Sequence, residues 1–113
     1  MKFAQIVFWI AGLFGLAACA GLYCQPGSYV YYGLIGTVIA WQFAFFLIAW
    51  DPRRYRPMML AAVLEKLLWV LTLAYLHLRG PVTMAELVSG TVPHGLLGLL
   101  FVAAYFLTPP KTA

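Results

Sequence analysis

Long apolar stretches separated by short polar turns dominate the chain. Residues 3–24, 29–50 and 58–78 each reach the roughly 20 apolar positions that a helix needs to cross a bilayer. A fourth stretch, residues 91–107, is shorter and begins with polar residues. The turns carry the proline and glycine residues that end helices. The pattern predicts four membrane spans in one transmembrane domain over residues 1–113, because no linker is long enough to separate domains.

Short connections require neighbouring spans to run in opposite directions. We therefore expect an all-α integral membrane protein folded as an up-down four-helix bundle. Small residues at helical spacing favour close approach of membrane helices. They are Gly12, Gly15, Gly33, Thr37, Ala40, Ala44, Gly95 and Gly98. Between Pro81 and the fourth span, residues 82–90 are expected to form a short helix lying in the membrane interface.

Composition supports the membrane and argues against catalysis. Hydrophobic residues make up 65% of the chain and charged residues only 9%, which is outside the range of a soluble domain. The sequence has no GxSxG, HExxH, P-loop or dinucleotide-binding glycine motif, and it contains only 3 acidic residues. We therefore expect neither an enzyme nor a bound cofactor.

The positive charges gather on one predicted side of the membrane. They are Lys2, Arg53, Arg54, Arg56 and Lys111. The opposite side holds Arg79 and Glu86. The positive-inside rule then places both termini in the cytoplasm. The bilayer accounts for the net charge of +4 without nucleic acid, and Arg53, Arg54 and Arg56 are expected to bind anionic lipid headgroups.

Two cysteines, Cys19 and Cys24, lie near the outer end of the first span. Residues 16–19, Leu-Ala-Ala-Cys, resemble a lipoprotein processing box. The apolar run continues beyond Cys19 to Tyr23, so a retained first span is the preferred interpretation. The spacing of the two thiols gives no zinc signature.

Glu65 is the acidic residue placed inside a predicted span, and a carboxylate at membrane depth is costly without a partner. Gln42 lies nine residues before Asp51, and Glu65 lies eight after Pro57. Both therefore stand about 12–13 Å from the same membrane edge, and we expect a hydrogen bond between their side chains.

Two further residues share the helix face of Glu65, namely Trp69 and Thr72. With Gln42 they define a predicted polar site inside the bundle, for a ligand or for a proton. Lys66 points about 100° away from Glu65 around the helix, so no ion pair is expected from adjacency. Its long side chain is expected to reach back to the cytoplasmic headgroups.

His77 closes the third span and His94 opens the fourth, so we expect them to flank the outer loop at similar depth. Two imidazoles at one level are weak candidates for a copper or haem site. Histidines at helix ends are more commonly just interfacial polar groups.

Three segments carry a family resemblance: Trp41-Gln42, the loop Asp51-Pro52-Arg53-Arg54-Tyr55-Arg56-Pro57, and Glu65-Lys66. They resemble a group of small uncharacterised four-helix bacterial inner-membrane proteins that look related to the DoxX-like families. The likeness covers the second and third spans, and the rest agrees in size and topology. It implies a four-helix fold in the bacterial inner membrane. It implies no activity, because the group has no established common one.

Three functional hypotheses follow from these residues. In the preferred one, a non-enzymatic membrane protein binds a lipid-like or small amphipathic ligand, or serves as accessory subunit of a membrane complex. The alternative is a small proton-coupled transporter or channel that uses Glu65. Because four helices enclose little volume, that protein would act as a homo-oligomer. A second alternative is a redox protein with haem or copper at His77 and His94.

Overall fold

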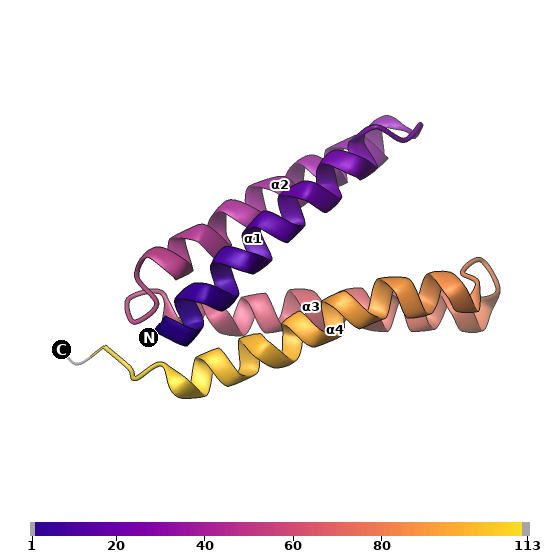
Figure 1. The fold of residues 1–113 in the computed structure, drawn as a ribbon. Helices are drawn as coiled ribbons and strands as arrows, with labels where there is room; N and C mark the ends of the chain where they lie inside the picture. The colour runs from indigo at the N-terminus through magenta and orange to yellow at the C-terminus, as the bar shows by residue number, and fades with distance from the viewer. Residues whose placement is uncertain (1, 112–113) are drawn as a thin grey trace.

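The structure, a computed structural model, describes residues 2–111, and within them the chain folds into four long helices without strands. The helices are α1 (Lys2–Tyr23), α2 (Tyr29–Trp50), α3 (Arg56–Arg79) and α4 (Met84–Leu107). All four are long and apolar enough to cross a membrane. The prediction of an all-α up-down arrangement of four spans is confirmed (Figure 1).

The helix ends follow from local sequence. Ser28 caps α2, since its hydroxyl oxygen accepts a hydrogen bond from the Tyr31 N–H at 3.3 Å. Pro57 stands in the first turn of α3, where its missing N–H costs nothing. Gly80 ends α3 with a φ of 104°, a left-handed conformation that glycine adopts without strain.

The start of α4 differs from the sequence-based expectation. The helix begins at Met84, seven residues before the expected start at 91, so residues 84–90 are its first two turns and not a separate interfacial helix. Thr83 and Glu86 form a capping box. The Thr83 hydroxyl accepts from the Glu86 N–H at 3.2 Å, and the Glu86 carboxylate accepts from the Thr83 N–H at 3.4 Å. This box fixes the helix start and places His94 ten residues inside α4.

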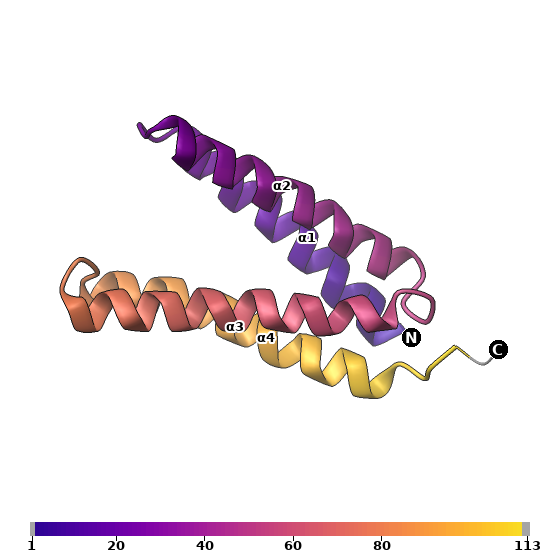
Figure 2. The same cartoon turned by 180° about the vertical axis from the view of Figure 1, so that it is seen from behind.

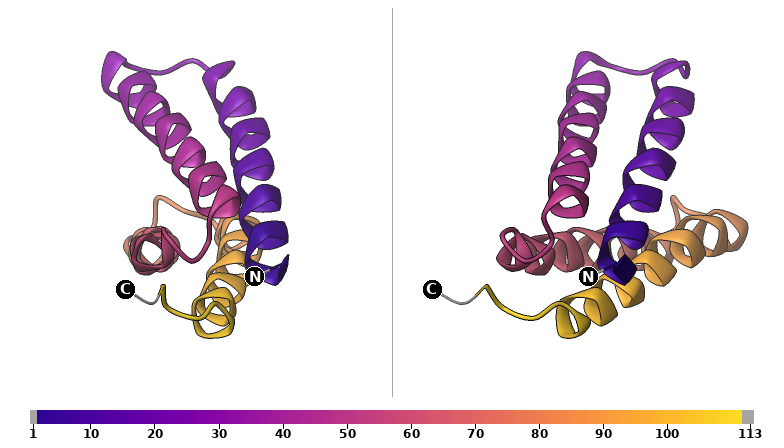
Figure 3. Two further views of the ribbon diagram at one scale, coloured as in Figure 1. Left: turned by 90° about the vertical axis from the view of Figure 1, so that its left-hand side faces the viewer. Right: turned by 60° about the vertical axis from the view of Figure 1, so that its left-hand side comes forward.

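The four helices form two hairpins, α1–α2 and α3–α4, that diverge from a shared end. Figure 1 and Figure 2 show both termini and the α2–α3 loop at that end, with the other two turns far apart. Figure 3 shows the hairpins leaving the shared end in different directions. Contacts between the hairpins run mainly from α1 to α4, and few join α2 to α3. The bundle is therefore V-shaped, with its α2–α3 side open.

Three phenylalanines pack the vertex of the V. The rings of Phe8 and Phe101 stack with centroids 4.4 Å apart, and Phe45 meets Phe101 at 5.2 Å and Phe8 at 5.8 Å. All three are fully buried, and they come from α1, α2 and α4. Aromatic pairs in such geometries attract through their quadrupoles as well as by dispersion. The hairpins are thus held together near their shared end.

Arg56 ties the end of α4 to the start of α3. Its Nε–H donates to the carbonyl oxygens of Tyr105 at 3.2 Å and Thr108 at 2.8 Å. The guanidinium also lies 3.8 Å from the centroid of the Tyr105 ring. A cation at a helix C-terminus satisfies carbonyls that lack partners within the helix.

Candidate functional site

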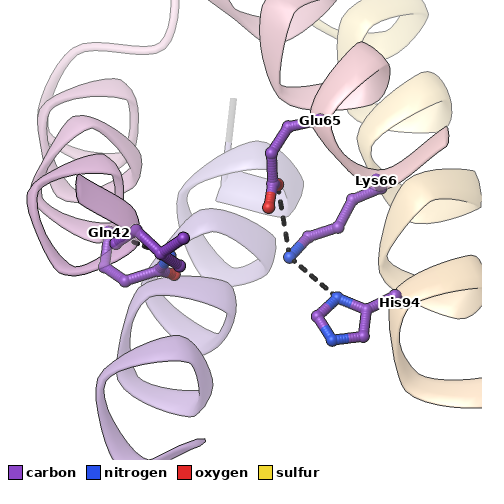
Figure 4. Close-up of polar contacts among 5 residues, drawn as sticks. Gln42, Glu65, Lys66 and His94 are labelled. Carbon is purple, nitrogen blue, oxygen red and sulfur yellow. Dashed lines mark hydrogen bonds and ion pairs between the residues drawn. The ribbon is translucent and has the colours of Figure 1, made fainter. Parts of the chain in front are cut away.

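A charged centre lies between the hairpins, just beyond the phenylalanine vertex. The Lys66 ammonium Nζ stands 3.3 Å from Glu65 Oε2 and 3.2 Å from His94 Nδ1 (Figure 4). The Lys66 side chain is only 3% exposed, whereas that of Glu65 is 26% exposed. The same ammonium lies 5.4 Å from the centroid of the Phe45 ring. One cation therefore has a carboxylate, an imidazole and an aromatic ring around it.

The expectation that Lys66 reaches the headgroups is wrong. The 100° between adjacent positions applies to the Cβ atoms, while the long side chains of Glu65 and Lys66 converge beyond them. Gly98 of α4 makes room for the lysine stem, because a Cβ there would lie 3.3 Å from Lys66 Cβ. The ammonium is thereby guided inward and not along the lipid face.

The contact between Glu65 and Lys66 is an ion pair by distance, but its angles do not make a hydrogen bond. Glu65 Oε2 is buried and has no hydrogen-bond partner among the described residues. Burying charges is costly unless they are paired, and pairing inside a membrane is the usual solution. The two charges thus stabilise each other, but Glu65 Oε2 can still accept a hydrogen bond.

His94 is held by aromatic rings from two other helices. The Trp69 ring of α3 lies over the imidazole with centroids 4.6 Å apart and a tilt of 35°. Phe14 of α1 meets the imidazole edge-on at 6.1 Å. These contacts fix the plane of the imidazole ring. The His94 side chain projects from α4 toward the first hairpin (Figure 4).

Gln42 is buried on α2 at 1% exposure. Its Nε2 donates to the Val38 carbonyl at 2.9 Å, and its Oε1 packs against Gly15 of α1 without a hydrogen-bond partner. The predicted hydrogen bond with Glu65 is not formed. The reason is local: the amide folds back onto its own helix, where a carbonyl one turn earlier accepts from it.

Two cavities meet at Glu65. The inner cavity, about 250 Å³, lies between the two hairpins, on the inner side of the V. A groove of about 870 Å³ runs along the open α2–α3 side. Glu65 and Trp69 line both. Gln42 lines only the inner cavity, and Thr72 only the groove. The four predicted site residues therefore divide between two connected spaces.

The walls of these cavities are mostly apolar. Besides the polar residues, the inner cavity is lined by Phe14, Gly15, Ala18, Cys19, Leu22, Leu34, Ile35 and Val38. The groove is lined by Leu34, Val38, Ala61, Leu64, Leu68, Leu73 and Leu76, together with Trp41. Apolar walls that converge on a few polar groups are typical of small-molecule sites.

The two histidines are not brought together. His77 Nδ1 lies 2.9 Å from the carbonyl oxygen of Val82, to which it donates at the end of α3, whereas His94 lies beside Lys66. Cys19 is buried near His94, and Cys24 is exposed. Within residues 2–111, no three His, Cys, Asp or Glu side chains are grouped to hold a metal ion. The expected common level of His77 and His94 is wrong because α4 begins earlier than predicted.

The three loop arginines occupy different environments. Arg54 is exposed, Arg53 is half-buried, and the Nε–H of Arg56 is engaged by α4. Of these side chains, that of Arg54 is the most accessible to a lipid headgroup.

Comparison of the chain with family models, curated proteins and solved structures finds no match. Sequence reasoning found Glu65, Gln42, Trp69 and Thr72 but missed Lys66 and His94 as members of the centre. The signal for His94 was present in the Thr83–Glu86 capping box, which sets the true depth of that residue.

Proposed function

We propose that this chain is a non-enzymatic membrane protein that binds a lipid-like or small amphipathic molecule between its two hairpins. The observation that carries the proposal is the inner cavity, whose apolar walls converge on the Glu65, Lys66 and His94 centre. A polar group buried at the end of an apolar passage suits a molecule with one polar end and one apolar chain.

The groove supplies the place for the apolar chain. Glu65 and Trp69 border both spaces, so a molecule with its polar end in the inner cavity has its chain directed along α2 and α3. The open α2–α3 side faces the bilayer and not water when the helices span it. A ligand of this kind enters sideways from the lipid phase, where such molecules are concentrated.

Ligand-dependent thermal stability in lipid nanodiscs tests the proposal. A panel of small amphiphiles is expected to raise the melting temperature of the wild type, because binding to the folded state alone stabilises it. Trp69→Leu removes a shared wall of both cavities and is expected to abolish the shift. Trp9→Leu is the matched control, since Trp9 packs on Phe46 away from the cavities. Equal shifts in both variants, or none in the wild type, would refute the proposal.

A proton-linked transporter is the second candidate, and one observation favours it. Glu65, Lys66 and His94 form a continuous series of titratable side chains with contacts of 3.2 and 3.3 Å at membrane depth. Proton uptake into liposomes that contain the protein, measured with a pH-sensitive dye, decides between the candidates. Transport that is lost in Glu65→Gln supports this one, and binding without transport supports the first.

We also propose a bacterial inner-membrane location with both termini in the cytoplasm. The α2–α3 loop contains Arg53 and Arg54, and the segment after α4 contains Lys111. Both this loop and the end of α4 lie at the shared end of the hairpins (Figure 1). Anionic headgroups of the cytoplasmic leaflet would attract these side chains. A reporter fused after Lys111 that is active only in the cytoplasm tests this orientation. Activity of a periplasm-dependent reporter at the same position would show the opposite orientation.

A further inference from the structure

We infer that His94 presents an imidazole N–H to the inner cavity and thereby selects a ligand whose polar end is an uncharged hydrogen-bond acceptor, such as a ketone or ester carbonyl. The inference rests on the proposed function, because it assumes that an amphipathic molecule occupies the cavity. It adds the chemical class of that molecule and the residue that recognises it.

The tautomer of His94 follows from its neighbour. An ammonium group has only donors, so the Lys66 Nζ at 3.2 Å requires an unprotonated Nδ1 as acceptor. The Glu65 carboxylate lies 3.3 Å from the same ammonium and pairs with its charge. The proton of a neutral imidazole must then sit on Nε2. Lys66 thus sets the hydrogen-bonding character of the opposite edge of the ring.

The orientation of the ring places this donor in the cavity. Figure 4 shows Nδ1 turned toward Lys66 and the other ring nitrogen facing away from it, on the side of the first hairpin. Trp69 and Phe14, which contact the ring, line the same inner cavity. No described residue accepts a hydrogen bond from Nε2, and this nitrogen is not among the fully buried polar atoms. It is therefore a donor open to a ligand.

The charges of the centre argue for an uncharged polar end. Lys66 and Glu65 neutralise each other within 3.3 Å, so the centre offers no net charge to balance that of a ligand. A buried cation would meet the Lys66 ammonium, and a buried carboxylate or phosphate would meet Glu65. A carbonyl oxygen accepts from His94 Nε2 without either penalty, and its alkyl chain follows the apolar walls.

The tautomer is tested directly by nitrogen NMR of protein labelled with ¹⁵N-histidine in nanodiscs. The chain has 2 histidines, so in the His77→Gln variant all histidine nitrogen signals come from His94. We expect an unprotonated Nδ1 and a protonated Nε2 in the wild-type environment. Lys66→Met should release this preference, because the ammonium no longer donates to Nδ1. A protonated Nδ1 in the presence of Lys66 would overturn the inference.

The ligand class is tested with four molecules of equal chain length: a methyl ketone, the alkane, the alkylammonium and the carboxylate. Each carries bromine on the same carbon of its chain, and Trp9, Trp41 and Trp50 are replaced by phenylalanine. Quenching of the remaining Trp69 fluorescence then reports occupancy of the cavity beside His94. We expect the ketone to bind about tenfold more tightly than the alkane, because one buried hydrogen bond contributes a free energy of that size. The ketone should also bind more tightly than the alkylammonium or the carboxylate. Protein-free nanodiscs correct for partitioning.

His94→Phe keeps a ring against Trp69 and removes the donor, so the preference for the ketone over the alkane should disappear. His94→Gln offers an amide N–H and should restore part of it, while His77→Phe should leave it unchanged. If the four molecules bind equally, the inference fails and the proposed function stands. If none binds, both fail. Tighter binding of the ammonium or carboxylate would also overturn the inference.

Discussion

At the scale of single residues, the Lys66 ammonium has three kinds of partner inside a predicted membrane span. It lies within 3.3 Å of Glu65, within 3.2 Å of His94 and over the Phe45 ring. Three different kinds of partner therefore compensate for its removal from water. Loss of this cation would leave the Glu65 carboxylate facing an apolar cavity alone.

Lys66→Met is expected to lower the free energy of unfolding by about 1–3 kcal/mol, the cost of leaving a buried polar partner unsatisfied. Glu65→Gln combined with Lys66→Met should cost less than the sum of the single changes, because the double variant has no orphaned charge. Unfolding by sodium dodecyl sulfate in mixed micelles measures all three variants. Strict additivity would show that the 3.3 Å contact contributes no coupling.

The residue scale is also where sequence reasoning was least complete. Glu65 was recognisable because a carboxylate in an apolar run demands an explanation. Its pairing with Lys66 was not, because helical spacing describes backbone directions while two long side chains can turn toward each other. The hydrogen bond expected between Gln42 and Glu65 failed for a similar reason, since the amide found a carbonyl on its own helix.

At the scale of helices, α1 and α2 meet through Gly15 and Gln42. A Cβ at Gly15 would overlap the Gln42 side chain, so the glycine permits the close approach of the two helices. By contrast, a Cβ at Gly36 meets nothing within 4 Å. The two positions form a matched pair for testing this contact.

Gly15→Ala is expected to destabilise the protein by about 1–3 kcal/mol, because Gln42 must leave a well-packed position. Gly36→Ala should be neutral or stabilising by up to about 1 kcal/mol, since alanine favours the helix over glycine. Detergent-induced unfolding followed by circular dichroism measures both. A Gly15 variant as stable as the Gly36 variant would contradict the described packing.

Arg56 joins α3 to the end of α4 with a geometry that lysine does not reproduce. Arg56→Lys loses the Nε donor to Tyr105 and Thr108 and the planar contact with the Tyr105 ring. We expect amide hydrogen exchange over residues 104–108 to accelerate by about tenfold, corresponding to one lost charge-assisted hydrogen bond. Arg54→Lys, at an exposed position, is the control and should leave this exchange unchanged. Equal exchange in both variants would show that the contact does not hold the end of α4.

Helix boundaries were predictable where a proline or a glycine marks the end of a helix. Pro57 and Gly80 mark the limits of α3 in the sequence as in the structure. The polar residues at the start of α4 lower the local hydropathy, so the apolar pattern placed the helix start at residue 91, although the capping box at Thr83 and Glu86 places it at Met84. Local hydrogen bonds decide where a helix begins, whereas hydropathy reports only where it meets lipid.

For the whole molecule, span number and antiparallel order followed from the apolar pattern and the short turns. The divergence of the hairpins did not, because periodicity identifies apolar faces but not the angle at which two hairpins cross. Small residues were an incomplete guide. Gly12, Gly15 and Gly98 do face another helix closely, but at Gly33 and Gly95 a Cβ would meet nothing within 4 Å.

Ligand binding is expected to bring the two hairpins closer together, because a molecule in the inner cavity contacts both of them. Spin labels on Cys24 and on Ala85→Cys, in a Cys19→Ala background, report the separation of the two far ends. The distance distribution should shift by a few ångströms to shorter values and narrow on addition of the ketone amphiphile. A pair within one hairpin, Leu78→Cys with Ala85→Cys and without Cys24, should not change. An unchanged distance between hairpins would show a rigid V.

The diverging hairpins also give the protein a wedge-shaped profile. The end that contains both termini is narrow, whereas the end with the two short turns is broad (Figure 1). In a bilayer, the two leaflets must therefore accommodate different cross-sectional areas of the same molecule. Opening and closing of the wedge changes the area in one leaflet only, so it does work against the lateral pressure of that leaflet. Lipid shape and membrane curvature should for this reason bias how widely the protein stands open.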